Sequence, residues 1–325
     1  MKAVLLRIWA AFCALGLIAQ PLCAKERAPL EIKDNGALDG AQQVAIVSFN
    51  VGFIFESVDQ TQKTGGLMGA FGGTTKARSE LVGVTPEMMQ QITDAAYADF
   101  VAKLAARGIT VVEADFSQLS GDKGPSEERI NLEKKSTGKA VFYAPSALPV
   151  QVFLRGDVAQ RKSLANFGDE GRIARNTYAV ENAAKANGIP AVGVVYLVDF
   201  SDQKRPGAFS FGGSLKVNAN LSVVPEFSRL TVIGANGKKN EIVLKQPVSV
   251  DGEFVEVSDA MGKREKTVQG AANVLGGLAA NSGIKLPMIG KTRKFAFTAI
   301  PENYQSGAIA LAEAANDTIL GPVGR

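Results

Sequence analysis

The sequence predicts an α/β fold, in the broad sense that includes α+β: a mixed sheet with helices packed on it, an extended β-hairpin region and a C-terminal helical tail. Two observations carry this prediction. One is the order strand, loop, helix, strand over residues 44–112, built around a helix expected at 86–107. The other is a second very apolar run, Val192 to Phe200, that matches the first, Val44 to Phe49. Because near-continuous apolar runs are typical of central strands covered on both faces, we expect the two to lie side by side.

The helix expected at 86–107 has clear start and stop signals. Thr85 is a good N-cap, Pro86 suits the first helical position, and Glu87 is favoured at the positive end of the helix dipole. Gly108 stands where a helix usually stops. Apolar side chains recur at helical spacing and predict one buried stripe, formed by Met88, Met89, Ile92, Ala96, Phe100, Val101 and Leu104.

The first 24 residues have the pattern of a secretory signal peptide. Lys2 and Arg7 precede an apolar run at 8–19, and residues 22–24 offer a cleavage site. The run is shorter than the roughly 20 residues that a membrane span needs, which argues against an anchor. Lipidation of Cys23 is an alternative, although the residue before it is a leucine rather than a small residue. We therefore expect an exported protein of the periplasm, with association with the outer membrane left open.

Removal of that segment limits the available chemistry. Both cysteines and the single tryptophan lie in it, and the chain has no histidine. The exported protein would have no disulfide, no thiol or histidine metal site, and no Ser-His-Asp or Cys-His catalysis. Its net charge falls from +4 to +2, because the segment carries two positive charges and no negative one. This is no electrostatic footprint for nucleic acid, and we expect no metal, no cofactor and no enzymatic activity.

After the signal we expect a lead-in at 25–43, an α/β domain at 44–260 and a helix–strand–helix extension at 261–325. The domain would contain a glycine-rich insertion at 60–84, longer than the loops of compact domains usually are. Two groups of apolar side chains between glycines are candidate partner or ligand contacts, namely Leu67, Met68 and Phe71 in this insertion and Phe209 and Phe211 in the turn at 207–213. The insertion is interpreted either as an apolar flap that touches a partner or as a disordered segment.

The other elements follow from local pattern. Asn236-Gly237 between two strand-like runs is a strong hairpin signal. In chain order, we expect a short helix capped by Ser126, an apolar segment at 141–153 that wraps the domain or forms an edge strand, a helix at 172–188, strands at 215–225, 229–233 and 241–257, a helix at 266–281, a strand at 294–300 and a helix at 301–320.

Carboxylates supply the remaining candidate chemistry. Asp199 and Asp202 follow the second central strand. Because ligands of open α/β sheets bind beyond the carboxyl ends of the strands, this pair marks the place to look for a small-molecule site. Asp94 and Asp99 lie opposite the apolar stripe of the helix at 86–107, and we expect them to face solvent.

The order of these elements resembles the curli secretion channel (CsgG) and its relatives, which include the amino-terminal domain of TolB and the activator LpoB. The segments that carry the resemblance are VAIVSFN, the helix at 86–107, ITVVEADF, ENAAKANGIPAVGVVYLVDFSD and KVNANLSVVPEFSRLTVIGANGKK. It covers roughly residues 44–257 and rests on apolar pattern rather than on an invariant motif. It implies a small periplasmic α/β domain. The channel is a lipoprotein that inserts two hairpins per subunit into the outer membrane, whereas this chain has a poor lipidation site and no clean pair of long alternating strands.

Three functions are compatible with these features. The first is a non-enzymatic envelope protein, an assembly or secretion accessory at the outer membrane that acts as an oligomer or with an envelope protein as partner. The second is a periplasmic protein that binds a lipid or a small apolar ligand under glycine-flanked loops. The third is a hydrolase that uses carboxylates alone, centred on Asp199. We take the first as the leading hypothesis, with the second as its alternative.

Overall fold

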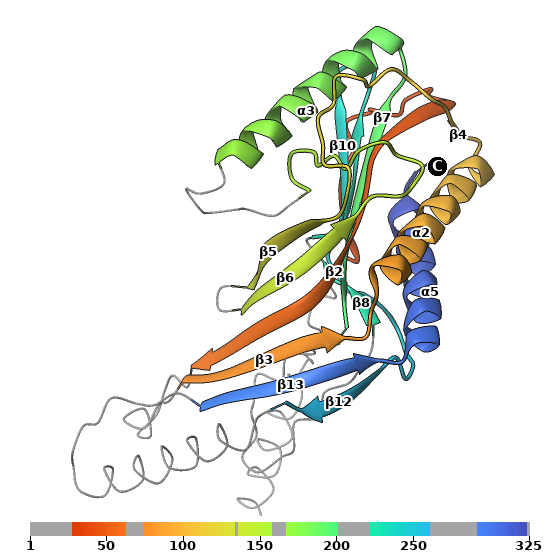
Figure 1. Cartoon of the computed structure of the whole chain (residues 1–325). Coiled ribbons are helices and arrows are strands. Elements are labelled where there is room, and N and C mark those ends of the chain that lie inside the picture. Colours follow the sequence, from red (N-terminus) through yellow and green to blue (C-terminus); the bar gives the residue numbers. More distant parts are fainter. Residues whose placement is uncertain are drawn as a thin grey trace, which may run out of the picture.

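The computed structural model confirms the α/β class. It describes one mixed sheet of 13 strands together with three helices, α2 (Pro86–Ala106), α3 (Phe167–Asn187) and α5 (Pro301–Leu320). In Figure 1, α2 and α5 lie side by side on one face of the sheet, and α3 lies on the other. The residues that the structure describes are 28–62, 74–133, 136–157, 167–200, 221–225, 227–260 and 291–323.

The two apolar runs are neighbours at the centre of the sheet, as the sequence predicts. They belong to β2 (Gln43–Gln62) and β7 (Ala191–Asp199), which pair in parallel. On one side of β7 the sheet continues in antiparallel order through β9 (Arg229–Ile233), β10 (Lys239–Leu244) and β1 (Leu30–Lys33). Three short strands complete this part, namely β4 (Thr110–Val111) beside β2, β8 (Leu221–Val223) beside β7, and β11 (Val248–Val250) beside β8.

On its other side, β2 leads the sheet away from this centre. It pairs with β6 (Ser136–Tyr143), which pairs in turn with β5 (Ser126–Glu133). The far half of β2 also pairs with β3 (Thr74–Val82). Beyond β3 come β13 (Lys291–Ala299), in parallel, and β12 (Val255–Asp259). Figure 1 shows these last strands extending away from the three helices.

Helix α2 forms as the sequence predicts. The Thr85 hydroxyl accepts a hydrogen bond from the Met88 amide at 3.2 Å, and Gly108 takes the positive φ of +78° that ends the helix. Its apolar stripe is buried, apart from Met89 and Val101, which are half-buried. The stripe packs on the centre of β2, where the Phe100 ring meets Phe49 at 5.6 Å between centroids. Burying this stripe is what holds the helix on the sheet.

Helix α5 begins and ends at the residues expected from the sequence. Its small residues allow close packing, since a Cβ on Gly307 would lie 2.2 Å from the Phe254 ring. Leu311, Ala315 and Ile319 are fully buried in the main core. The described part of the expected extension at 261–325 therefore supplies a strand inside the sheet and a helix of the core, while the helix expected at 266–281 lies outside the described residues.

Several expectations about local structure are wrong. The short helix expected after Ser126 is strand β5, and part of the loop expected at 60–84 is strand, since β2 runs to Gln62 and β3 begins at Thr74. Both segments lie in strands because neighbouring strands pair with them: β6, the next strand along the chain, pairs with β5, and the distant β13 pairs with β3. Residues 141–143 of the segment expected at 141–153 belong to β6, which is no edge strand because it lies between β2 and β5. The lead-in contains strand β1, and the strand expected at 241–257 is divided among β10, β11 and β12.

Candidate functional site

The carboxylate predicted to mark a ligand site is buried. Asp199, the last residue of β7, is 8% exposed. It lies close to the fully buried Tyr304 of α5, whose pKa is raised by burial and, to a smaller extent, by the Asp199 charge. Asp199 is therefore a buried side chain close to the C-terminal helix, and not an open ligand site. Asp202 lies outside the described residues, as do the apolar candidates Leu67, Met68, Phe71, Phe209 and Phe211.

A cavity of about 410 Å³ lies at the opposite end of the central strands, where β2 and β7 begin. Its lining residues include the polar residues Asp39, Gln42, Gln43 and Asn236. Asn236 is already engaged, because its side chain donates to the Gly36 carbonyl at 2.7 Å. The amino ends of strands are not where open α/β sheets usually hold ligands, and no sequence signal pointed to this cavity.

The most distinctive feature is the part of the sheet that extends from the body. We call it the lobe, and it consists of β3, β13, β12 and the far half of β2, Glu56–Gln62. The strand register places Gln62 opposite Thr74, and Thr75 opposite Lys291. Gln62, Thr74 and Lys291 therefore lie at the same end of the lobe, although the sequence places Lys291 far from the other two.

The base of the lobe is fixed by a bulge and an ion-pair cluster. The pairing of β2 with β6 is irregular between Ile54 and Glu56, and bulges bend and twist a strand. The Glu56 carboxylate lies 3.0 Å from the nitrogens of both Arg78 on β3 and Lys139 on β6. Burial alone would raise the pKa of Glu56, but the hydrogen bonds and charges of Lys139 and Arg78 outweigh it and lower the pKa. Three strands are thus tied together where the lobe leaves the body.

The two faces of the lobe differ near its base. One face is buried and includes Ser79, Leu81 and Phe297, whose ring lies 4.8 Å from that of Phe200. The other face is exposed and carries, among others, Arg78, Glu80, Val82, Glu256 and Thr298. The strands at the centre of the sheet are therefore covered on both faces, whereas the strands at the base of the lobe are covered on one face only.

The outer edge of the lobe is strand β12. Among the strands that the structure describes, β12 pairs with β13 alone. Val257, in its middle, is 43% exposed. An exposed apolar edge strand is a template for pairing with another chain, and natural proteins usually protect such edges with charge. The charged residues of β12 are Glu256 and Asp259, both acidic, and the strand contains no basic residue.

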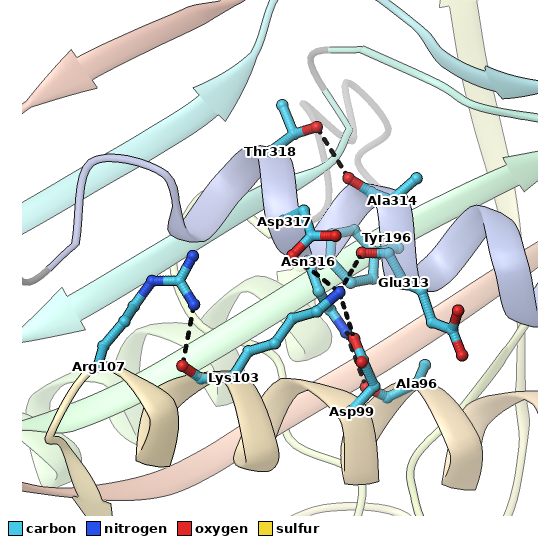
Figure 2. Close-up of polar contacts among 10 residues, drawn as sticks. All are labelled: Ala96, Asp99, Lys103, Arg107, Tyr196, Glu313, Ala314, Asn316, Asp317 and Thr318. Atoms are coloured by element: carbon cyan, nitrogen blue, oxygen red, sulfur yellow. Dashed lines mark hydrogen bonds and ion pairs between the residues drawn. The ribbon is translucent and has the colours of Figure 1, made fainter.

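A polar cluster joins α5 to α2 and to the sheet (Figure 2). The buried Tyr196 hydroxyl donates to the Asn316 side-chain oxygen at 2.7 Å, and the Asn316 amide donates to Asp99 at 2.8 Å. Lys103 lies 3.0 Å from both Asp99 and Asp317. Burial alone would lower the pKa of Lys103, but these two carboxylates outweigh it and raise the pKa. The cluster holds three elements together, and its polar groups bond to one another.

The structure therefore corrects the expectation that two aspartates of α2 simply face solvent. Asp99 is half-buried in the cluster just described. Asp94 accepts hydrogen bonds from the backbone amide and the hydroxyl of Ser146, at 2.6 and 2.9 Å. Both carboxylates fix neighbouring segments of chain. The sequence gives no signal for this, because their partners are 52 and 217 residues away.

Within the described ranges, no three His, Cys, Asp or Glu side chains gather as a metal site would require. None of the helices described is both long and apolar enough to cross a membrane. Comparison of the chain with protein-family models, with curated proteins and with solved structures gives no match. The resemblance to the curli secretion channel therefore stays a prediction.

Proposed function

We propose that the protein is a non-enzymatic protein of the cell envelope that works as an assembly or secretion accessory at the outer membrane and associates through its lobe. The partner is a second copy of the chain or another envelope protein. The observation that supports this proposal is the exposed edge of β12 on a lobe that extends from the body. The expected signal peptide at 1–24 supports the location.

The shape of the lobe supports contact rather than catalysis. Near its base, one face is occupied by the protein's own core, and the other presents exposed side chains of mixed charge. A sheet edge can instead recruit another chain through main-chain hydrogen bonds, with side chains of alternate residues adding specificity. Exposed Val257 on that edge adds apolar area to such a contact.

The experiment is size-exclusion chromatography with light scattering on the mature chain, residues 25–325, over a wide range of concentration. We expect an oligomer that Val257→Lys weakens, because a charge on an edge strand opposes pairing. The matched control is Val82→Lys, which places the same charge at a similarly exposed valine on β3, a strand paired on both sides. A strict monomer at high concentration, or equal effects of the two variants, would contradict association through β12.

The location has a separate test. Fractionation of cells of the native host should place the protein in the outer-membrane fraction or in a complex that sediments with it. Recovery of a free monomer in the soluble periplasm would favour the alternative, a periplasmic protein that binds a small ligand.

The cavity at the amino ends of β2 and β7 is the observation that favours this alternative. Its volume of about 410 Å³ lies within the range of small-molecule sites. Gln42 and Gln43 in its lining fit a polar ligand better than the lipid or apolar ligand expected from the sequence. Native mass spectrometry of protein purified from its own host would detect a retained ligand.

A further inference from the structure

The face of the sheet opposite α2 and α5 has a separate covering layer. It consists of the segment 150–157 and α3, and we call it the cover. Arg155 donates its backbone N–H to the Thr177 hydroxyl at 2.9 Å, which joins the two parts. Beneath the cover lies a hydrophobic cluster separate from the main core, formed by Val47, Val152, Leu154, Val180, Ala184, Ala191 and Ile233. Phe153 of the segment belongs to the main core, and Ile173 of α3 packs against it. A surface layer that shares few buried contacts with the main core opens at lower free energy than that core.

The cover is attached to the centre of the sheet by a narrow polar contact. The Ser48 hydroxyl and the Asn50 amide of β2 both donate to the Val152 carbonyl, at 2.6 and 2.7 Å. Next to it, Leu154 lies directly over Gly193 of β7, where a Cβ would come within 2.6 Å of the Leu154 side chain. The described sheet thus holds this segment through the Val152 carbonyl and through buried apolar side chains, since Leu154 covers Gly193 and the Phe153 ring lies 5.4 Å from that of Phe142 on β6.

A single acidic side chain is enclosed where the segment turns. Asp157 is 1% exposed, and one carboxylate oxygen accepts the Leu154 amide at 2.6 Å. The other oxygen accepts no hydrogen bond from the described residues. The charges that face it come from the sheet below, from Arg229 on β9 and from Lys239 and Glu241 on β10. Gly156, with φ of +97°, leaves room for the Arg229 guanidinium.

We propose that the cover is a pH-responsive layer, held more firmly over the sheet at acid pH than at neutral pH, because Asp157 is enclosed when the cover is closed and reaches water when it opens. The proposal concerns regulation. It is independent of the association through the lobe, because it depends on Asp157 and its neighbours and not on β12.

The direction follows from the protonation of Asp157. Burial raises the pKa of its carboxyl to about 6, against the ordinary value of 3.8 that it regains on opening, and the Leu154 amide and Arg229 only partly offset this. The closed form therefore keeps its proton to higher pH than the open form. As pH rises from about 4 to about 6, the closed form loses relative stability, and above about 6 the loss is complete.

The expected change in the opening equilibrium constant of the cover is large enough to measure. Across the whole window the opening equilibrium constant would rise roughly a hundredfold, and by about twentyfold between pH 4.5 and 7.5. Hydrogen–deuterium exchange with mass spectrometry on the mature chain measures this constant once intrinsic exchange rates are corrected for pH. We expect the rise in peptides from 150–157 and from α3, and not in peptides from α2, which lies on the other face.

Three variants test the cause. Asp157→Asn should remove the pH dependence. Lys239→Gln should move the plateau to higher pH, and Glu241→Gln should move it to lower pH, because the first charge lowers the pKa of Asp157 and the second raises it. Both lie on β10 and are half-exposed, so these substitutions test the idea even if Asp157→Asn fails to fold. Corrected exchange in the cover that does not change with pH, or a plateau that both β10 variants move the same way, would overturn the proposal.

Discussion

At the scale of single residues, buried polar side chains determine how the C-terminal helix is seated. Tyr196 and Asn316 are both buried and bond to each other although 120 residues separate them. Tyr196→Phe should lower the free energy of unfolding by about 1 to 2 kcal/mol, because the Asn316 oxygen loses its donor inside the protein. Urea unfolding of the chain that begins at residue 25 measures the difference.

Tyr97→Phe is the matched control for that prediction. Tyr97 also packs on Phe49, at 5.5 Å between ring centroids, but it is half-buried and its hydroxyl bonds to no described residue. Its loss should change stability by only a few tenths of a kcal/mol, as is usual away from buried networks. Equal effects of the two substitutions would mean that the Tyr196–Asn316 hydrogen bond contributes no more to stability than an unbonded hydroxyl does.

Glu56 gives a prediction with a defined pH dependence. Glu56→Gln should destabilise the protein by about 1 kcal/mol at neutral pH, an amount discounted because Arg78 and Lys139 are partly exposed. The pKa of Glu56 is lowered in the folded state, so the stabilisation exists above the ordinary glutamate pKa and is lost as pH falls through the lowered value. The difference between variant and parent should therefore shrink in acid.

Glu80→Gln is the control for Glu56→Gln. Glu80 lies opposite Glu56 on β3, is exposed, and has no ion pair with a described residue. Its substitution should be neutral or slightly stabilising, because like charges on opposing residues repel. A loss as large as that of Glu56→Gln would show that any change of charge at the base of the lobe matters, and not the specific ion pairs.

At the scale of elements, the sequence predicts best those that carry their own signals. Helix α2 has a cap, a stripe and a stop within its own residues, and it was predicted to within about one residue at its end. Thr85→Ala should cost about 1 kcal/mol, since the Met88 amide loses its partner, whereas Thr85→Ser should retain most of the stability. Thermal or urea unfolding of the two variants compares them directly.

The elements for which the prediction was wrong lack such internal signals. Residues 126–133 contain Ser126-Glu127-Glu128, which would suit a helix start, yet they form β5 because β6 pairs with them. Strand β3 has glycines before it and charges along it, and it is a strand because β2 and β13 pair with it from both sides. The partner β13 lies more than 200 residues away, so the sequence alone could not predict β3. The Asn236-Gly237 hairpin was predicted because the turn is local, and its Gly237 amide bonds to the Gly234 carbonyl at 2.9 Å.

At the scale of the whole molecule, β2 links two environments. Its first half pairs with β7 at the centre of the sheet and is covered by α2, and Phe49 and Phe53 there are 0% and 1% exposed. Beyond the irregularity at Ile54 and Glu56, it enters the lobe, where the described sheet is covered on one face only. The site residues proposed from sequence did not reveal this division, because Asp199 is buried and the lobe is built from segments at 56–62, 74–82, 255–259 and 291–299.

This division predicts a gradient of hydrogen exchange along a single strand. Amides of β2 before Ile54 should exchange only on global unfolding, whereas those beyond Glu56 should exchange faster in dilute protein, because buried core contacts set local stability. If the lobe is the surface of association, protection beyond Glu56 should rise with protein concentration while the first half stays unchanged. Val257→Lys should abolish that rise, and Val82→Lys should not. Uniform protection along β2 at every concentration would mean that the lobe is as stable as the body and does not depend on a partner.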